Sequence, residues 1–500
     1  MAGVERERPF PPGAYDVIVV GSGPAGLQTA YFLARSGIPR HAVLSRDDEP
    51  GGMFQRFPVF QRLISWTKPQ APVEPGSREY EWYDHNSLLG HEPDHRALIR
   101  DFMDRSFDVP AREEMEAALR AFVDRAAVEV RYGCTLERAR REGEELVLDT
   151  SDGEYRCRAA VFALGVTQPW LPPIPGVEHA RHYVDTGRPA DYDGKRLVII
   201  GKRNSAFEVA QGLLPWAREL TLVSPRPVQT AVLSLSPLRV RYLQPYDEYV
   251  RGGSGTSVVD GAVERIERRA DGFRVHAEGT TWAGKLELDG DDVIVATGFR
   301  TPLEPLAELG VATVADGRIP AQTPFWESVS ARGVYFAGNA TQGSPGMAKH
   351  GAAANSTSVN GFRYNARVLV RHLAEQHFGI AAPRPELGRD EVAPLLLDEL
   401  ARAPELWIQK GYLGRVVSFD ETHGIRDEGI LPLAHFVDEP GPPAAAAAVE
   451  VDAEGTIVPV LYLRRAGRVA EHLLDPHPLH DFDGSAHRGE LEARLRPLIG

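Results

Sequence analysis

Short runs of apolar residues that end in glycine or other small residues dominate the first three quarters of the chain. Such runs cover 17–20, 41–44, 196–200, 220–223, 158–164 and 292–296. Continuous apolar runs of this length are typical of strands buried on both faces of a parallel sheet. After the first run, apolar residues at helical spacing predict a helix from Ala25 to about Ser36. The alternation of strand and helix predicts an α/β fold.

The first run leads into a turn that contains Gly21, Gly23 and Gly26. In a dinucleotide fingerprint, the first glycine makes a tight turn and the second lets the backbone approach the pyrophosphate. The third glycine allows the helix to pack closely on the strand. The amides at the start of that helix, and its positive dipole end, then face the phosphates. The turn therefore predicts a dinucleotide site.

A second, less regular fingerprint follows about 180 residues later. Gly201 keeps its place, whereas Arg203 stands at the second glycine position and Ala206 at the third. Lys202 and Arg203 add positive charge where phosphates are expected. Arg226 follows the next strand, and an arginine there is suited to a ribose 2′-phosphate, which favours NADPH over NADH.

Two such sites in one chain predict a flavin that exchanges electrons with a nicotinamide. At the runs that end in Gly165 and Gly298, the chain is expected to cross between two nucleotide domains. The stretch 333–339 is expected to return to the flavin. The predicted fold is therefore α/β, with two Rossmann-like domains and a small C-terminal α+β extension. The FAD domain covers 14–180 and 299–378, the inserted NADPH domain covers 190–298, and the extension covers 379–500.

Each cofactor is expected to contact a defined set of residues. The FAD set is Gly21, Ser22, Gly23, Pro24, Ala25, Gly26, Arg46, Gly52, Met53, Phe54, Gly165, Gly338 and Asn339. The NADPH set is Gly201, Lys202, Arg203, Asn204, Ser205, Arg226, Thr297 and Gly298. The strand at 41–44 should end in an acidic residue that binds ribose, but Ser45 stands there, so Asp47, Asp48 or a water is expected to take that role.

Composition narrows the partners. The net charge is −14 at neutral pH, which argues against nucleic acid and against an anionic membrane surface. No apolar run is long enough to span a membrane, and residues 1–8 have no apolar core of a signal peptide, so we expect a cytoplasmic protein. No metal site is predicted. Cys134 and Cys157 form no Cys-x-x-Cys pair, which counts against self-contained disulfide chemistry.

Two further regions are less specific. Residues 57–93 are rich in aromatic side chains that either line a cavity or pack a loop onto the surface. Residues 380–500 contain no nucleotide motif but show a helical stretch near 395–402 and strand-like stretches at 414–419 and 457–463. The alanine-rich stretch 440–448 is expected to be a flexible connector or a hairpin loop.

Several stretches together resemble a known group of proteins. Residues 23–33, 62–68, 84–90, 201–208 and 361–364 are similar to those of FAD-dependent oxidoreductase-domain flavoproteins, whose best-known animal member resides in the endoplasmic reticulum. The resemblance runs from about residue 15 to 375. More distantly, the chain resembles class B flavin-containing monooxygenases.

The more distant resemblance implies a reaction and a site. In class B monooxygenases NADPH reduces FAD, oxygen adds to form a flavin hydroperoxide, and an asparagine stabilises it. Here Trp66 or Thr67 stands at that place, which puts a long-lived hydroperoxide in doubt, and Asn86 is a nearby replacement. An asparagine before Ser87 also suits a helix cap. These three residues are the candidate catalytic group.

The leading hypothesis is an NADPH-consuming FAD monooxygenase that oxygenates a small molecule at nitrogen, sulfur or carbon, with molecular oxygen as co-substrate. One alternative is a reductase or oxidase that passes electrons to a thiol, quinone or partner protein. The other is a flavin-bearing scaffold whose C-terminal region binds a partner. A homodimer is left open.

Overall fold

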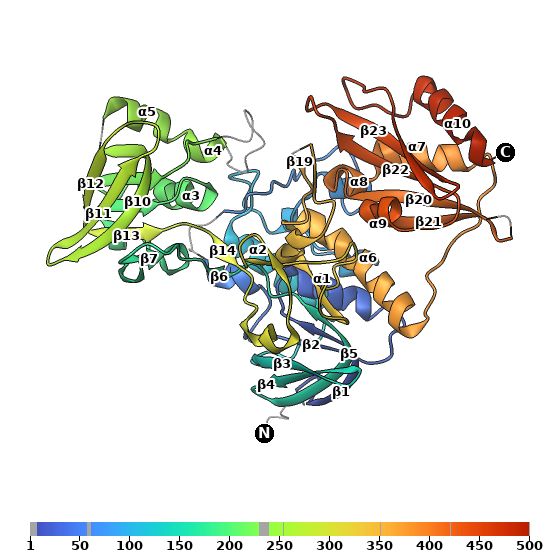
Figure 1. The fold of residues 1–500 in the computed structure, drawn as a ribbon, viewed down its shortest axis with the longest axis horizontal. Helices are drawn as coiled ribbons and strands as arrows, with labels where there is room; N and C mark the ends of the chain where they lie inside the picture. Colours follow the sequence, from blue (N-terminus) through green and yellow to red (C-terminus); the bar gives the residue numbers. More distant parts are fainter. Residues whose placement is uncertain are drawn as a thin grey trace.

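Three β-sheets organise the protein in this computed structural model, which describes residues 8–57, 62–229, 240–253, 255–350, 352–420 and 422–499. We call the three parts around these sheets the first, second and C-terminal lobes. The first lobe occupies the centre of the molecule, with the second lobe on one side and the C-terminal lobe on the other (Figure 1).

The first lobe is a sheet of six strands in the order β2-β1-β5-β4-β3, with β17 paired to β5. β1 pairs in parallel with both β2 and β5. Alternate residues of β1 enter different apolar clusters, with Val17 and Val19 on one face and Ile18 and Val20 on the other, as expected of a strand buried on both faces. Its elements are β1 (Gly13–Val20), α1 (Pro24–Leu33), β2 (His41–Leu44), α2 (Arg112–Arg125), β3 (Leu136–Glu142), β4 (Glu145–Thr150), β5 (Gly153–Phe162), β17 (Val334–Phe336) and α6 (Val359–Phe378).

The second lobe is a sheet of seven strands in the order β12-β11-β10-β9-β8-β13-β7. The chain enters and leaves it through β6 (Gln168–Pro169) and β14 (Phe299–Arg300), which pair with each other. These are the crossings predicted at Gly165 and Gly298. The elements are β7 (Arg181–His182), β8 (Arg196–Ile200), α3 (Asn204–Leu213), β9 (Glu219–Ser224), α4 (Val240–Leu243), α5 (Tyr246–Gly252), β10 (Thr256–Arg269), β11 (Gly272–Gly279), β12 (Lys285–Gly290) and β13 (Asp292–Val295).

The C-terminal lobe is an antiparallel sheet of five strands, β21-β20-β22-β23-β24, with helices around it. The helical stretch and both strands predicted in this region are present. The elements are α7 (Val392–Arg402), α8 (Pro404–Ile408), β20 (Leu413–Asp420), β21 (Gly424–Pro432), α9 (Leu433–Asp438), β22 (Ala444–Val451), β23 (Ile457–Arg465), β24 (Arg468–Leu473) and α10 (Ser485–Ile499). Two small hairpins, β15–β16 (Thr313–Val314, Ile319–Pro320) and β18–β19 (Ala348–Lys349, Ala352–Ala353), lie between β14 and α6.

The alanines 444–448 form the first part of the central strand β22, so the prediction of a flexible connector or a hairpin loop is wrong for them. Ala445 and Ala447 face one apolar cluster, and Ala446 faces another with Leu433 and Phe436. Layers on both faces lie close to this strand, and alanine is the side chain that fits between them. Low complexity here reflects tight packing.

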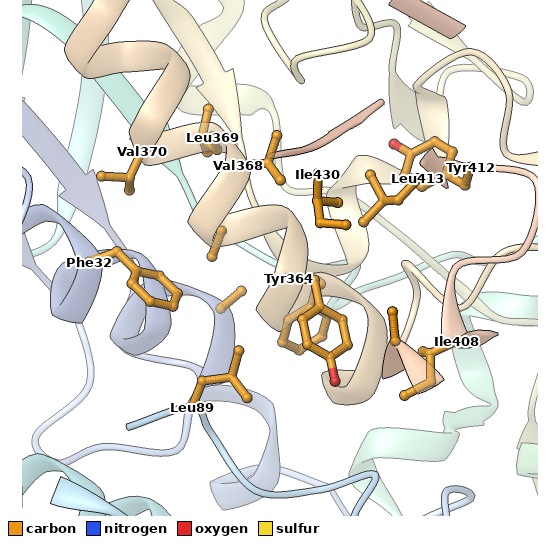
Figure 2. Packing of buried hydrophobic residues seen from close by; sticks show 14 of the residues in the cluster. Phe32, Leu89, Tyr364, Val368, Leu369, Val370, Ile408, Tyr412, Leu413 and Ile430 are labelled. Carbon is orange, nitrogen blue, oxygen red and sulfur yellow. The ribbon is translucent and has the colours of Figure 1, made fainter. Parts of the chain in front are cut away.

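The C-terminal lobe shares one core with the first lobe. α6 lies between them, and Figure 2 shows its residues Tyr364 and Val368 between Phe32 of α1 and Ile430 of β21. All four belong to one continuous cluster of buried residues. The C-terminal lobe is therefore built onto the first lobe through a common core. Throughout the described parts of the chain, no helix has both the length and the apolar character to cross a bilayer.

Candidate functional site

A cavity of about 350 Å³ is lined by residues of the first and second lobes. Both fingerprints reach it, the first through Gly21–Ala25 and the second through Asn204 and Ser205. The predicted residues that line it are Gly21, Ser22, Gly23, Pro24, Ala25, Arg46, Gly52, Met53, Phe54, Asn86, Gly165, Asn204, Ser205, Gly338 and Asn339. The predicted residues that are not part of its lining are Gly26, Trp66, Thr67, Gly201, Lys202, Arg203, Arg226, Thr297 and Gly298.

The glycines of the first fingerprint differ in what surrounds them. A Cβ on Gly26 would stand 1.9 Å from the carbonyl oxygen of Gly21, so the helix can pack this close only without a side chain. A Cβ on Gly23 would meet no atom within 4 Å. Because Gly23 also precedes the first turn of α1, its backbone faces open space of the cavity where the free amides of the helix begin. This cradle fits a pyrophosphate.

The end of β2 carries no acidic side chain, as predicted, and its neighbours reorganise around Ser45. The Ser45 hydroxyl lies 2.7 Å from that of Ser22, and its oxygen accepts a hydrogen bond from the amide of Asp47. Asp47 lines the cavity, whereas Asp48 does not, and the Asp47 carboxylate is paired with Arg56. Of the two predicted substitutes, Asp47 is the one that the fold places at the site.

The second fingerprint makes the same turn at Gly201, where a Cβ would stand 2.5 Å from the carbonyl oxygen of Ala296. Arg203 precedes α3 and is exposed, and Ala206 is fully buried in the close-packed position. Arg226 is exposed just beyond β9. The two arginines are thus open to a ligand at this edge of the sheet.

Lys202 does not lie where a phosphate would need it, which corrects its predicted role. Its ammonium group is buried, donates to the carbonyl oxygen of Val259 at 2.9 Å and is paired with Asp260. The hydrogen bond from Lys202 lowers the pKa of Asp260. This lysine therefore ties the fingerprint loop to β10.

Thr297 and Gly298 hold the crossing between the lobes. The Thr297 hydroxyl donates to the carbonyl oxygen of Trp170 at 2.7 Å, and the Trp170 amide donates to that of Gly298 at 3.1 Å. Both contacts fasten the entering strand to the leaving one. In the structure Thr297 and Gly298 join the two crossing strands, and their contact with NADPH stays a prediction.

Of the three candidate catalytic residues, only Asn86 faces the cavity. Its side-chain amide donates to the carbonyl oxygen of Ser65 at 3.0 Å and to the hydroxyl of Thr67 at 2.9 Å. Thr67 is fully buried behind it and donates to Asp84. Trp66 packs on His85, with ring centroids 4.2 Å apart. Thr67 therefore positions Asn86 and Trp66 has no place in the cavity wall, which corrects their predicted roles.

The aromatic-rich stretch 57–93 packs mainly against other parts of the protein. Within its described residues, Phe57 lines the cavity and Tyr80 is buried. The ring of Trp82 packs against that of Trp407 in the C-terminal lobe, with centroids 4.8 Å apart. Of the two readings, packing accounts for most of these side chains.

Glu208 of α3 lines the cavity and was missed by the sequence analysis. The Tyr183 hydroxyl donates to one of its carboxylate oxygens at 2.8 Å, and the other oxygen is buried without a hydrogen bond of good geometry among the described residues, although the Arg62 backbone lies close enough to lower the pKa of Glu208. Burial raises the pKa of Glu208 to about 7, although the bond from Tyr183 and the charge of Arg241 oppose the shift. A buried carboxyl with a pKa near neutrality in a cavity fits a ligand that donates a hydrogen bond or exchanges a proton.

Neither cysteine is poised for redox chemistry. Cys134 and Cys157 are buried free thiols, and only Cys134 lines the cavity. Burial raises the pKa of both thiols. Within the described ranges, no group of histidine, cysteine and acidic side chains could hold a metal ion.

Comparison with known proteins agrees with this geometry. A family model described as pyridine nucleotide-disulphide oxidoreductase matches residues 18–338. FAD-dependent oxidoreductase domain-containing protein 2 of Danio rerio is 26% identical over 474 residues, which cover 82% of this chain and 66% of that protein. The chain thus spans about two thirds of that relative's length. A ferredoxin–NADP reductase of Salinispora tropica is 28% identical over 71% of this chain and 94% of its own.

Solved structures share the fold. Bacillithiol disulfide reductase from Staphylococcus aureus has a TM-score of 0.57 at 17% identity, over 73% of this chain and 99% of its own. A flavin-containing monooxygenase from Stenotrophomonas maltophilia has a TM-score of 0.53 at 22% identity, over 72% and 98%. The predicted Rossmann-like fold and the resemblance to FAD-dependent oxidoreductase-domain proteins are confirmed.

Proposed function

We propose that this chain, which belongs to the pyridine nucleotide-disulphide oxidoreductase family, is a monooxygenase that uses NADPH and molecular oxygen to oxygenate a small molecule. As a member of the family it is an oxidoreductase, and FAD and NADPH are its cofactors. Oxygen as the electron acceptor and a small molecule as the substrate are the proposed part.

The residues of the cavity divide between the two cofactors. Gly21–Ala25, with the start of α1, would hold the FAD pyrophosphate, and Asn339 would reach the remainder of the flavin. Asn204 and Ser205 would hold NADPH at the start of α3. Arg203 and Arg226, which are exposed outside the cavity, would bind its 2′-phosphate. The bound pair would supply hydride transfer between nicotinamide and flavin and electrons for oxygen.

Glu208 and Asn86 would contact a substrate that lies in the cavity beside the cofactors. Glu208, with a pKa of about 7, can hold or release a proton near neutral pH beside the second fingerprint. The Asn86 side chain is fixed by Ser65 and Thr67, so it cannot turn away from the cavity without losing two hydrogen bonds. Both are preorganised polar groups in a largely buried wall.

The observation that carries the proposal is that one cavity brings together both fingerprints, a fixed amide and a buried acid. The sequence holds only two cysteines, and the fold buries both, so a dithiol relay within this chain has no support. A small-molecule substrate meeting reduced flavin inside the cavity fits this arrangement.

The test is the stoichiometry of NADPH and oxygen consumption and of hydrogen peroxide release, with and without candidate amines, sulfides and ketones. We expect peroxide release without substrate, less peroxide with a suitable substrate, and an oxygenated product. Asn86→Ala should raise the peroxide fraction. Stoichiometric peroxide with every small molecule tried would contradict a monooxygenase.

A reductase that transfers electrons to a partner protein is the second candidate. It is favoured by the similarity over most of their length to proteins named ferredoxin–NADP reductase. Rapid NADPH-dependent reduction of an added ferredoxin, with little oxygen consumption, would support it over the monooxygenase.

A further inference from the structure

The C-terminal lobe contacts the segment that carries Asn86. Arg78 makes a bidentate pair with Glu399 of α7, at 2.7 and 2.9 Å, and a second pair with Glu405 of α8 at 2.9 Å. Burial opposes ionisation of Glu405, but Arg367 and Arg78 hold its pKa at about 2. Two acidic side chains of the C-terminal lobe thus pair with the arginine that begins the segment leading to the cavity wall.

α6 extends this connection to the wall itself. The buried guanidinium of Arg363 donates to the carbonyl oxygens of Ser87 and Glu81, at 2.8 Å each. Asp84 accepts from the amides of Asn86 and Ser87 at 3.0 Å. The backbone on both sides of Asn86 is therefore fixed by charged groups behind the cavity.

A second connection ends at another part of the cavity wall, the start of α6. Gln409, fully buried just after α8, donates to the hydroxyl of Ser356 at 2.8 Å and to the side-chain oxygen of Asn365 at 2.7 Å. Asn365 in turn donates to the same hydroxyl at 2.9 Å. Ser356 directly precedes Thr357 and Ser358, which line the cavity at the start of α6.

Tyr412 makes the same connection nearby. Its hydroxyl accepts from the indole N–H of Trp326 at 2.7 Å and lies 2.6 Å from the hydroxyl of Ser344. Ser344 follows the 3₁₀ helix Gly338–Gly343, which carries the cavity residues Gly338 and Asn339.

We propose that the C-terminal lobe is a positioning device for the flavin cavity: Gln409 and Tyr412 hold the wall segments 338–344 and 356–359 in the geometry that binds FAD. The proposal rests on the proposed function in so far as the cavity holds FAD. It assigns a role to residues that lie outside both fingerprints and outside the matched family region. Gln409 and Tyr412 are not part of the cavity lining and act through Ser356 and Ser344.

The test compares FAD binding by the full-length parent, Gln409→Met and Tyr412→Phe. Methionine keeps roughly the volume of Gln409 but removes its hydrogen bonds, so the dissociation constant of FAD should rise roughly tenfold. At saturating FAD, the visible circular dichroism of the bound flavin should also change, because the wall around it has shifted.

Ser418→Ala is the matched control. The Ser418 hydroxyl is likewise buried in the C-terminal lobe, but it bonds to Glu428, away from the cavity. We expect its FAD affinity and flavin spectrum to equal those of the parent, even where the apoprotein melts earlier. Equal changes in control and Gln409→Met at equal loss of melting temperature would show a merely structural effect and overturn the proposal.

The remaining outcomes are also decisive. Should Gln409→Met not fold, Tyr412→Phe carries the same expectation through a change of one oxygen atom. Unchanged FAD affinity and spectrum in the folded variants would refute the positioning role while leaving the proposed function intact. A parent that binds no FAD would overturn both.

Discussion

At the scale of single residues, the environment of each glycine separates folding from binding. Gly23 faces open space, and Gly26 faces the carbonyl oxygen of Gly21 at a distance that no side chain permits. The glycine spacing was legible in the sequence because it is dictated by local backbone geometry. The glycine that faces the ligand can also be predicted from the sequence, once the turn is recognised.

Gly23→Glu should fold but lose FAD, since a carboxylate would replace the space for the pyrophosphate. Gly23→Ala is the matched variant and should retain FAD, because its methyl group meets no atom within 4 Å. The ratio of flavin to protein absorbance after gel filtration measures both. Full flavin content in Gly23→Glu would show that the first fingerprint has been misread.

Donor choice should depend on Arg226 and not on Lys202. Arg226→Ala removes an exposed charge-assisted contact worth roughly 1.5–3 kcal/mol, so the KM for NADPH should rise about tenfold or more and that for NADH should stay the same. Lys202→Met should affect both donors alike, because Lys202 is already paired with Asp260. Steady-state kinetics with both nucleotides decides; an equal effect of Arg226→Ala on both would exclude the 2′-phosphate contact.

Glu208 illustrates what sequence reasoning misses at this scale. A glutamate four residues into a helix has no distinctive pattern, and its pKa of about 7 arises from burial by the lobe around it. The only signal was its place on the helix that follows the second fingerprint. Its neighbour Tyr183 comes from a distant stretch, and only the fold brings the two together.

Glu208 should make the nucleotide-free protein less stable as pH rises. The pKa of Glu208 in the folded protein lies above the unfolded value of 4.5, so the folded state keeps the proton up to a higher pH. The free energy of unfolding therefore falls by about 3 kcal/mol between about pH 4.5 and pH 7. Glu208→Gln mimics the protonated form and should remove this loss, raising the melting temperature at pH 8 and not at pH 4.5. The exposed Glu219→Gln is the control and should change neither.

At the scale of elements, the parallel strands were predictable because burial on both faces leaves an uninterrupted apolar run. β22 was not, because alanine has a weak preference for strands and five in succession suggest low complexity. Its alternation between two clusters becomes visible only when β20 and β23 lie beside it. What decides its conformation is the space left by neighbours distant in the sequence.

A larger side chain in β22 should therefore be harmful. Ala446→Leu would overfill the layer formed with Leu433 and Phe436 and should cost roughly 1–3 kcal/mol. Ala453→Leu, in the exposed turn after β22, should cost almost nothing. Urea unfolding of both variants measures the difference; equal stability would mean that β22 is more loosely packed than described.

At the scale of the whole molecule, the chain forms the first lobe, enters the second lobe through β6 and returns to the first through β14 and β17. The sequence did not show how the C-terminal lobe relates to these two. The residues that join it, such as Arg78 with Glu399 and Glu405, lie more than 300 positions apart and carry no mark of pairing in one sequence. Long-range contacts of this kind are fixed by tertiary packing alone.

A cavity in the core of the C-terminal lobe should weaken the retention of FAD. Val449→Ala removes volume from the cluster shared with the first lobe, at a cost of roughly 2 kcal/mol, and should lower the temperature of FAD release and of unfolding together. Val275→Ala makes the same change in a separate cluster of the second lobe and should leave FAD release nearly unchanged. Flavin fluorescence during heating distinguishes them, and identical shifts would argue against a selectively shared core.

The common core around α6 also limits how this protein can vary through evolution. A segment exchanged between related flavoproteins would have to bring both sides of that helix with it, since Tyr364 and Val368 contact the first lobe and the C-terminal lobe in one layer. Substitutions on α6, α7 and α8 should consequently be inherited in matched sets, whereas the face of the second lobe around Val198, Val223 and Val293, which has a cluster of its own, is freer to change.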